Sequence, residues 1–271
     1  MGVIRVRMNA QQVESYLRTL NGGWVDYNDT VDTWKAGDPH VEVTGIAVGW
    51  MSYAWALEAA ARLGCNLFIT HEPTFFHHTD ADPALLARPE AQAKRAKIDA
   101  LGLTILRCHD LWDQLPEIGI PDSWGRALGL GQPIGGEGFF RVYDGLGQTA
   151  AEIASATARR LRDLGQPGVQ LIGPPDQVVR RIVVGTGAET PYYKMLTEYR
   201  ADLVICTDDG LHYWRDGAHA IDNGHSLLVF HHHVSEEEGL KSLARHLTEQ
   251  VPGVPVHHIP QTCMYRLVLP D

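Results

Sequence analysis

The stretch that decides the fold runs from residue 41 to residue 73 and reads VEVTGIAVGWMSYAWALEAAARLGCNLFITHEP. Residues 41–49 are rich in β-branched and apolar side chains, which favours a strand. Residues 54–63 place alanine and leucine at helical spacing, and Gly64 ends that helix. Residues 66–70 form a second, short apolar run that stops just before a histidine. A strand, a helix and a strand in this order predict an α/β fold.

Strands and helices alternate in the same way over the rest of the chain, which predicts largely parallel sheets. Asn9 is the expected N-cap of the first helix, Pro89 suits the first turn of another, and Thr149 with Glu152 forms a capping box. The expected helices outside the first stretch span residues 10–20, 89–101, 122–128, 149–164, 192–199, 214–223 and 236–249. The expected strands there span residues 103–107, 170–172, 181–184, 203–206, 226–230 and 254–258.

A glycine-rich segment divides the chain. Seven glycines fall between residues 129 and 147, a composition typical of a boundary between two units. We therefore predict two α/β modules with mixed, largely parallel sheets and helices on their faces. Residues 1–130 together with 225–271 form the expected metal-ligand-bearing domain, and residues 131–224 form the second domain.

The two halves also repeat each other weakly. Residues 45–49 end 21 residues before the polar segment 70–72, and residues 181–185 end 22 residues before the polar segment 207–209. In both places a strand, a helix and a second strand end in threonine followed by two polar residues. Either the halves are similar α/β modules, or βαβ units simply resemble one another.

Composition and charge narrow the class of protein. The chain has 271 residues, of which 44% are hydrophobic and 21% charged, so it can bury a sizeable core. Its formal net charge of −10 argues against a general nucleic-acid surface, because phosphate binding needs a basic face. No apolar run approaches the roughly 20 residues that cross a bilayer, so we expect no membrane partner.

The N-terminal segment and the cysteines favour a cytoplasmic location. Residues 1–8 have neither a long apolar core nor a small-residue cleavage site, so they do not resemble a signal peptide. The four cysteines are scattered and form no CxxC pair. Buried, reduced thiols are therefore the expected state.

Histidines and carboxylates follow three of the expected strands. The first group is His71-Glu72, the second is His109 with Asp113, and the third is the triple histidine at residues 231–233. In open α/β sheets, ligands bind beyond the carboxyl ends of the strands. If the three strands are parallel neighbours, these side chains converge at one edge.

The third group lies at the expected start of a helix. Ser235 and Glu238 fit a capping box, and Glu237 then favours the helix dipole from a solvated position. Glu236 is left to point back at the strand end, where it and His232 can reach one ion.

Mixed histidine and carboxylate sets suit Zn, Mn, Fe or Co rather than Ca or Mg alone. Carboxylates also bridge pairs of ions that share a water. We therefore expect two divalent metal ions (Zn, Fe, Mn or Co). The alternative is a group of surface histidines beside a solvated acidic helix start.

These residues resemble the motifs of the dinuclear-metal-centre hexameric protein family. Its members are often named GTP cyclohydrolase 1 type 2 homologues, or Ngg-interacting-factor-three-like proteins. The resemblance covers nearly the whole chain. The family's TGI strand and its T/S-H-H-P end match residues 43–46 and 70–73, and its H-x-x-x-D motif matches His109 and Asp113. Its C-terminal H-x-x-x-E-x-x-G-x-x-x-L motif matches residues 232–243 in register.

The resemblance implies two α/β domains, a ring-shaped homohexamer and a shared set of metal ligands. Those ligands would be His71, Glu72, Asp113, His232 and Glu236.

Two departures from the family pattern affect this set. Glu72 stands where the family has the second histidine of H-H-P, which shifts the metal preference or weakens one ion position. His231 replaces the glycine that usually precedes His232, so a shifted register with His231 or His233 as the ligand stays open.

The expected activity is that of a metal-dependent hydrolase, in which a metal-bridging water attacks a small phosphorylated or cyclic-amide substrate. The alternative is a non-enzymatic metal-binding or regulatory scaffold, and the sequence leaves open whether the chain is an enzyme. His109 and His212 also stay open as contributors to the site. Residues 185–187, Gly-Thr-Gly, are typical either of an anion-binding strand end or of close strand–helix packing.

Overall fold

The structure is a computed structural model that describes residues 8–188, 190–268 and 270. Contacts between Cα atoms divide the chain into two compact units, and each unit is described by itself. Unit 1 comprises residues 1–115 and 240–260, and unit 2 comprises residues 116–239 and 261–271.

Helices and strands alternate in both units. The elements of unit 1 are α1 (Ala10–Thr19), β1 (Trp34–Ala36), β2 (Ile46–Gly49), α2 (Ala54–Arg62), β3 (Leu67–Thr70), α3 (Pro83–Leu86), α4 (Pro89–Ala100), β4 (Thr104–Arg107), α5 (Asp110–Gln114) and β10 (Val256–His258). Those of unit 2 are α6 (Ile120–Leu128), β5 (Arg141–Asp144), α7 (Ala150–Leu161), the 3-10 turn Arg162–Leu164, β6 (Gln170–Ile172), β7 (Arg181–Val184), α8 (Tyr192–Thr197), β8 (Leu203–Thr207), the π-helical turn Tyr213–Gly217, α9 (Ala218–Asn223) and β9 (Ser226–Phe230). The helix α10 (His232–Gln250) contains the boundary between residues 239 and 240.

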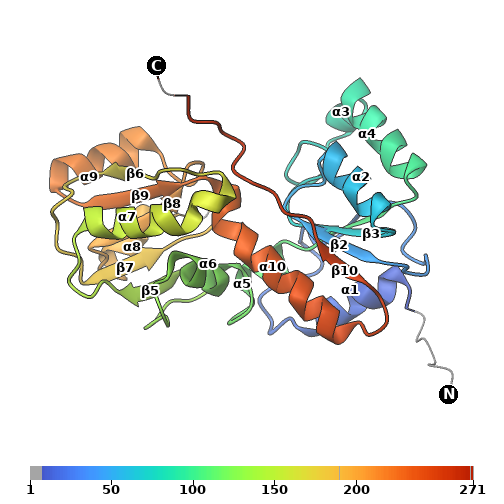
Figure 1. The fold of residues 1–271 in the computed structure, drawn as a ribbon, viewed down its shortest axis with the longest axis horizontal. Coiled ribbons are helices and arrows are strands. Elements are labelled where there is room, and N and C mark those ends of the chain that lie inside the picture. The colour runs from blue at the N-terminus through green and yellow to red at the C-terminus, as the bar shows by residue number, and fades with distance from the viewer. Residues whose placement is uncertain (1–7, 189, 269, 271) are drawn as a thin grey trace. The chain divides into compact units, whose positions relative to one another are not determined.

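Unit 1 is built on a mixed five-stranded sheet in the order β1-β4-β3-β2-β10. Neighbours among β4, β3, β2 and β10 are parallel, whereas the edge strand β1 is antiparallel to β4. Figure 1 shows β2, β3 and β10 side by side. Leu57 of α2 and Ile98 of α4 share a hydrophobic core with Phe68 of β3, so both helices cover one face of this sheet.

Unit 2 is built on a second mixed sheet, in the order β5-β7-β8-β9-β6. The strands β7, β8 and β9 are parallel, and the two edge strands are antiparallel to their neighbours. Ile153 of α7 and Ile205 of β8 belong to one core, while Met195 of α8 and Val204 of β8 belong to another. Successive residues of β8 thus point to opposite faces, and helices cover both faces of the sheet. The fold class predicted from the sequence is confirmed in both units.

The two sheets share a topology. In each, a helix and a short antiparallel strand precede three parallel strands joined by helices, and that antiparallel strand pairs with the third of them. In unit 1, β1 pairs with β4, and in unit 2, β6 pairs with β9. This correspondence favours the interpretation that the weak repeat in the sequence reflects two similar α/β modules.

Most local expectations hold. Asn9 caps α1 in a capping box with Gln12, and Thr149 caps α7 in a capping box with Glu152. Pro89 occupies the first turn of α4. The strand β9 begins and ends where the sequence predicted it, at residues 226 and 230.

The expectation that the three strands before the histidine groups are neighbours in one sheet is wrong for β9. β3 and β4 are parallel neighbours in unit 1, but β9 pairs with β8 and β6 in unit 2. Apolar runs of similar length fit either sheet, so their order could not be read from the sequence. The expected domain limits, residues 1–130 with 225–271 and residues 131–224, stay a prediction that differs from these contact-based units.

Among the described residues, none of the helices is long and apolar enough to cross a membrane. The interpretation that residues 1–8 are no signal peptide concerns a segment of which residues 1–7 lie outside the described part of the chain.

Candidate metal centre

Two loops at the carboxyl edge of the unit 1 sheet carry metal-type side chains. β3 and β4 are parallel and in register, with Thr70 opposite Arg107, so the residues that follow them leave the sheet at the same edge. His71 follows β3 directly, and His109 follows β4. Asp113 lies one helical turn further along, on α5.

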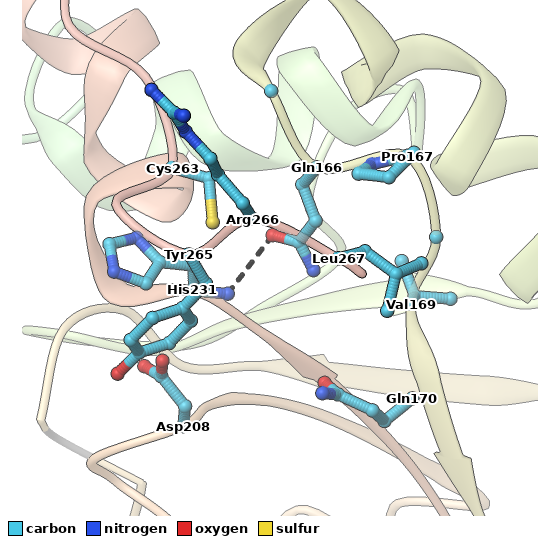
Figure 2. A pocket seen from close by; sticks show the side chains of 12 residues that line it. Gln166, Pro167, Val169, Gln170, Asp208, His231, Cys263, Tyr265, Arg266 and Leu267 are labelled. Carbon is cyan, nitrogen blue, oxygen red and sulfur yellow. Dashed lines mark hydrogen bonds between the residues drawn. The ribbon is translucent and has the colours of Figure 1, made fainter. Parts of the chain in front are cut away.

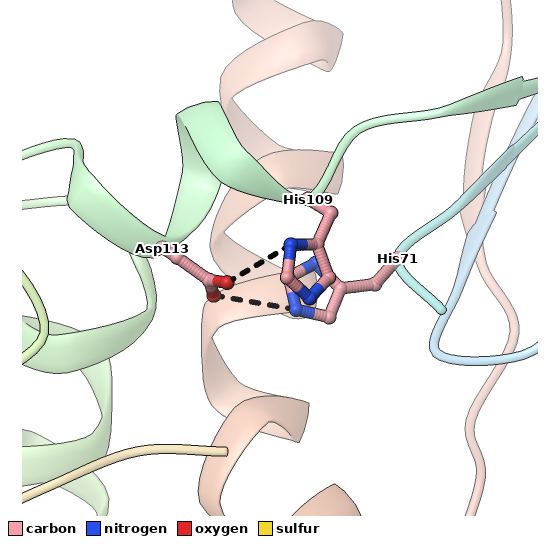
Figure 3. Close-up of side chains that lie close together, drawn as sticks. All are labelled: His71, His109 and Asp113. Atoms are coloured by element: carbon pink, nitrogen blue, oxygen red, sulfur yellow. Dashed lines mark ion pairs between the residues drawn. The ribbon is translucent and has the colours of Figure 1, made fainter. Parts of the chain in front are cut away.

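His71, His109 and Asp113 form a compact, largely buried cluster (Figure 3). Nε2 of His71 lies 3.3 Å from Oδ1 of Asp113, and Nδ1 of His109 lies 3.3 Å from Oδ2 of the same carboxylate. One potential ligand atom from each residue lies within 4.8 Å of the others. These distances bring donors from two different loops within reach of a single ion.

The donor set suits a transition metal. Imidazole and carboxylate together are the ligands that Zn, Fe, Mn and Co accept. Oδ1 of Asp113 is buried and accepts no hydrogen bond from any described residue. A buried carboxylate oxygen without a donor is costly unless a cation satisfies it. The residues present therefore fit a divalent ion.

Hydrogen bonds fix the imidazole of His71. Its Nδ1 lies 3.1 Å from the carbonyl oxygen of Cys108, which can only accept, so Nδ1 carries the proton. Nε2 is then the nitrogen with a lone pair, and it is the one that faces Asp113. Such an outer partner is typical of metal-binding histidines.

Asp32 positions α5 and therefore Asp113. Its carboxylate accepts hydrogen bonds from the backbone N–H groups of His109 (2.6 Å), Asp110 (2.9 Å) and Leu111 (2.9 Å). These are groups at the start of a helix that would otherwise have no partner. Burial raises the pKa of Asp32, although the backbone hydrogen bonds oppose this effect. The sequence analysis overlooked Asp32, because its role depends on a fold-level contact.

Charge around His109 favours its protonated form. Burial acts to lower the pKa of His109, but the charge of Asp113 and the hydrogen bond from Asp110 outweigh it and leave the pKa raised. Asp110 is itself held by Thr30, whose hydroxyl donates to it at 2.6 Å. A metal ion at this cluster must therefore compete with a proton.

Glu72 has a cationic partner that the sequence did not suggest. Its Oε2 lies 3.1 Å from Nη2 of Arg107, the last residue of β4, and both side chains are buried. Arg107 also donates through Nε to the carbonyl of His71 and through Nη1 to the carbonyl of His78.

In unit 2, His232 and Glu236 lie one turn apart at the start of α10. Nε2 of His232 is 2.9 Å from Oε1 of Glu236, and its Nδ1 is 2.6 Å from Oδ2 of Asp209, in the loop after β8. A carboxylate only accepts, so the proton of this imidazole sits on Nδ1 and the lone pair of Nε2 is directed at Glu236. The spacing matches that of His109 and Asp113 after β4, the corresponding strand of the other module.

Gly187 closes in on the same two side chains. A Cβ at this position would lie 2.8 Å from Oε1 of Glu236 and 3.0 Å from Nε2 of His232, and the backbone φ is +52°. Only glycine combines that approach with that conformation at low cost. Of the two interpretations of residues 185–187, this geometry favours close packing, directed at the candidate ligands.

The expected capping box at Ser235 is wrong. α10 begins at His232, so Ser235 lies inside the helix and its hydroxyl donates to the carbonyl of His232. Glu237 is fully buried rather than solvated, and its Oε2 lies 2.7 Å from Nε2 of His233. The earlier start rotates each residue to a different face, because a helix turns by about 100° per residue.

His231 lines a cavity of about 310 Å³ in unit 2 (Figure 2). Gln166 accepts a hydrogen bond from the backbone N–H of His231, and Tyr265 packs edge-on against its ring. Asp208 also lines the cavity and accepts a hydrogen bond from the backbone N–H of His232, at 3.0 Å. His212, left open by the sequence, is half exposed and contacts Arg215 and Asp216.

The fold and these clusters define an α/β protein with buried side chains of metal-ligand type at its strand ends. The sequence pattern of the family described as Duf34/NIF3 (NGG1p interacting factor 3) matches residues 30–263. The chain therefore belongs to this family, which confirms the resemblance seen in its motifs. No curated protein sequence matches the chain.

Solved structures of low sequence identity share the fold. The hypothetical protein SA1388 of Staphylococcus aureus has a TM-score of 0.80 at 17% identity, over 96% of this chain and 99% of that one. A Bacillus cereus protein related to NIF3 has a TM-score of 0.78 at 14% identity, over the same shares of the two chains. TTHA1606 from Thermus thermophilus has a TM-score of 0.68 at 17% identity, over 95% of this chain and all of the other.

Proposed function

We propose that this chain binds two divalent metal ions and uses them as a metal-dependent hydrolase. The proposed ligands are His71, Glu72, Asp113, His232 and Glu236, with His109 as an additional ligand. The observation that carries the proposal is the buried cluster of His71, His109 and Asp113, in which Asp113 presents a carboxylate oxygen that accepts no hydrogen bond from the described residues.

When bound, the ions would polarise the scissile group and lower the pKa of water toward neutrality. The protein's own residues prepare the donors for this task. The carbonyl of Cys108 directs the lone pair of His71, and Asp209 directs that of His232. Asp32 holds the start of the helix that carries Asp113. Donors fixed in this way lose little freedom when an ion binds.

The proposed substrate is a small phosphorylated or cyclic-amide compound. The net charge of −10 repels large anions, whereas a local dication admits a small one. The cavity in unit 2 suits the part of the substrate that does not react, because its size is at the lower end of typical small-molecule sites. Asp208 connects this cavity to His232 through the backbone.

Metal analysis and a substrate screen test the proposal together. The purified full-length protein is assayed for bound Zn, Fe, Mn and Co and then screened against phosphoesters and cyclic amides. We expect bound metal, and turnover that disappears in the Asp113→Ala and His232→Ala variants. Metal retained without turnover would favour a non-enzymatic metal-binding or regulatory scaffold, and a complete lack of metal would refute both functions.

We also propose that the chain assembles as a homohexamer and works in the cytoplasm. Both statements rest on the family resemblance and on the sequence features described above. Size-exclusion chromatography with light scattering tests the assembly: a mass of six chains supports it, and a monomer refutes it.

A further inference from the structure

A buried arginine lies beside the candidate metal ligands. Arg107 is the last residue of β4 and its side chain is completely buried. Nη2 donates to Oε2 of Glu72 at 3.1 Å, Nε donates to the carbonyl of His71 at 2.8 Å, and Nη1 donates to the carbonyl of His78. All three nitrogens of the guanidinium are therefore engaged by the loop that follows β3.

This arginine remains charged in the folded protein. A guanidinium keeps its proton at any physiological pH, so burial cannot neutralise it as it would neutralise a lysine. Its charge reaches the neighbouring groups: burial first, and then Arg107, lower the pKa of His78. The charge is compensated by the carboxylate of Glu72, and taking that carboxylate away would leave a buried cation alone.

The pairing changes what Glu72 offers to a metal ion. One of its oxygens is held by a charge-assisted hydrogen bond, and a dication that uses this carboxylate is repelled by the guanidinium. Asp113 differs, because its two oxygens face the imidazoles of His71 and His109, which give up their protons when a metal binds. The two carboxylates of unit 1 are therefore unequal as ligands.

We propose that Arg107 determines how many metal ions this chain holds tightly. One ion binds tightly at His71, His109 and Asp113, whereas the position that Glu72 serves holds a second ion only weakly, because Arg107 already supplies positive charge there. This inference rests on the proposed metal-binding function and specifies its stoichiometry.

The register of the sheet explains why this effect belongs to Arg107. Thr70 and Arg107 are paired across β3 and β4, so a long side chain at residue 107 reaches the first residues after β3. A histidine at position 72 in place of glutamate would be a neutral ligand and would give the arginine no counter-charge. The carboxylate and the guanidinium therefore have to be exchanged together to recover a second strong site.

The test titrates Co²⁺ into the metal-free full-length protein and follows binding by calorimetry and by the visible absorption of bound Co²⁺. We expect the unmodified chain to bind one ion tightly and a second at least about tenfold more weakly. The Glu72→His/Arg107→Met double variant is expected to keep the first ion and to bind the second with an affinity within about tenfold of it.

Two further variants separate charge from folding. Glu72→Gln/Arg107→Met removes both charges and should keep the first ion without strengthening the second, since an amide is a weak ligand. Arg62→Met, at the exposed end of α2, is the matched control and should change neither ion. Circular dichroism and thermal melting identify any variant that fails to fold.

The possible outcomes distinguish this inference from the proposed function. Two equally tight ions in the unmodified chain would overturn the role of Arg107 and leave the metal-binding function standing. A folded Glu72→His/Arg107→Met protein that gains no second ion would also overturn it, as would loss of the first ion in the Glu72→Gln/Arg107→Met protein. A chain that binds no Co²⁺ at all would refute the proposed function itself.

Discussion

The imidazole rings of His71 and His109 stack with their centroids 4.6 Å apart and their planes inclined by 20°. They come from loops after two neighbouring parallel strands, and the carboxylate of Asp113 faces a nitrogen of each ring. Two protonated imidazoles so close together would repel each other, whereas two neutral ones can share a cation. The stacking therefore places the rings where a metal ion stabilises the arrangement better than protons do.

Replacing Asp113 with asparagine should remove most of the affinity for the first metal ion. Asparagine keeps the shape of the side chain but loses the negative charge, and we expect a loss of more than about 100-fold, which exceeds the effect of losing an outer partner. Calorimetric titration with Zn²⁺ measures it. Asp99→Asn, on the exposed side of α4, is the matched control and should bind as the unmodified chain does. Equal affinity in the two variants would exclude Asp113 as a ligand.

Metal affinity should fall as the pH falls. The raised pKa of His109, which results from Asp113 and Asp110 outweighing burial, means that a proton has to leave before a metal binds. Affinity therefore increases with pH until the pH passes the pKa of His109, by up to about tenfold per pH unit for one proton. Titrations between about pH 5.5 and 8, a range that brackets the usual pKa of histidine, measure the slope in the same buffer ions. The His109→Gln variant should show a shallower slope, and an unchanged slope would contradict the assignment.

The sequence could predict each half of the candidate site but not the contacts that orient it. His71 and His109 were visible because each follows an apolar run that is long enough for a strand only, and the pairing of β3 with β4 confirms the inferred edge. Glu237 was misplaced because the helix start depends on where the chain leaves β9, which no local signal marks. Arg107 looked like an ordinary strand end, since a buried ion pair is a property of two segments brought together by the sheet.

The same limit applies to the loop before β1. Asp32 lies in a polar segment that resembles a surface loop, yet its carboxylate accepts three backbone N–H groups of α5. Replacing it with alanine leaves those groups buried without an acceptor, and we expect the free energy of unfolding to fall by roughly 2–4 kcal/mol. Urea denaturation measures this change.

Asp29→Ala provides the matched control for this experiment. Asp29 is exposed in the same loop, and we expect its replacement to change the free energy of unfolding by less than about 0.5 kcal/mol. If Asp32→Ala were equally harmless, the hydrogen bonds to α5 would not contribute to stability.

Gly187→Ala should disturb the candidate ligands of unit 2 directly. The added methyl group would lie 2.8 Å from Oε1 of Glu236, and the φ of +52° adds a backbone cost of about 1 kcal/mol or more. Gly131→Ala separates the two effects, because Gly131 also has a positive φ, of +80°, but open space around it. Urea denaturation and Zn²⁺ titration of both variants should show a loss of stability in each and a loss of metal affinity only in Gly187→Ala. Equal metal affinity would mean that Gly187 does not shape the site.

Asp209→Asn should release His232 from its fixed tautomer. The 2.6 Å contact between Nδ1 of His232 and Oδ2 of Asp209 keeps the proton on Nδ1, and an amide can donate as well as accept, so this preference is lost. Proton–nitrogen correlation spectra of the imidazoles in the metal-free protein report the tautomer directly, whether or not the chain is an enzyme. We expect the affinity for the ion that His232 binds to fall by about 10- to 100-fold. Asp222→Asn, at an exposed position of α9, should change neither the spectrum of His232 nor the affinity. An unchanged Nδ1 proton in Asp209→Asn would show that the backbone around His232, and not the carboxylate, sets its orientation.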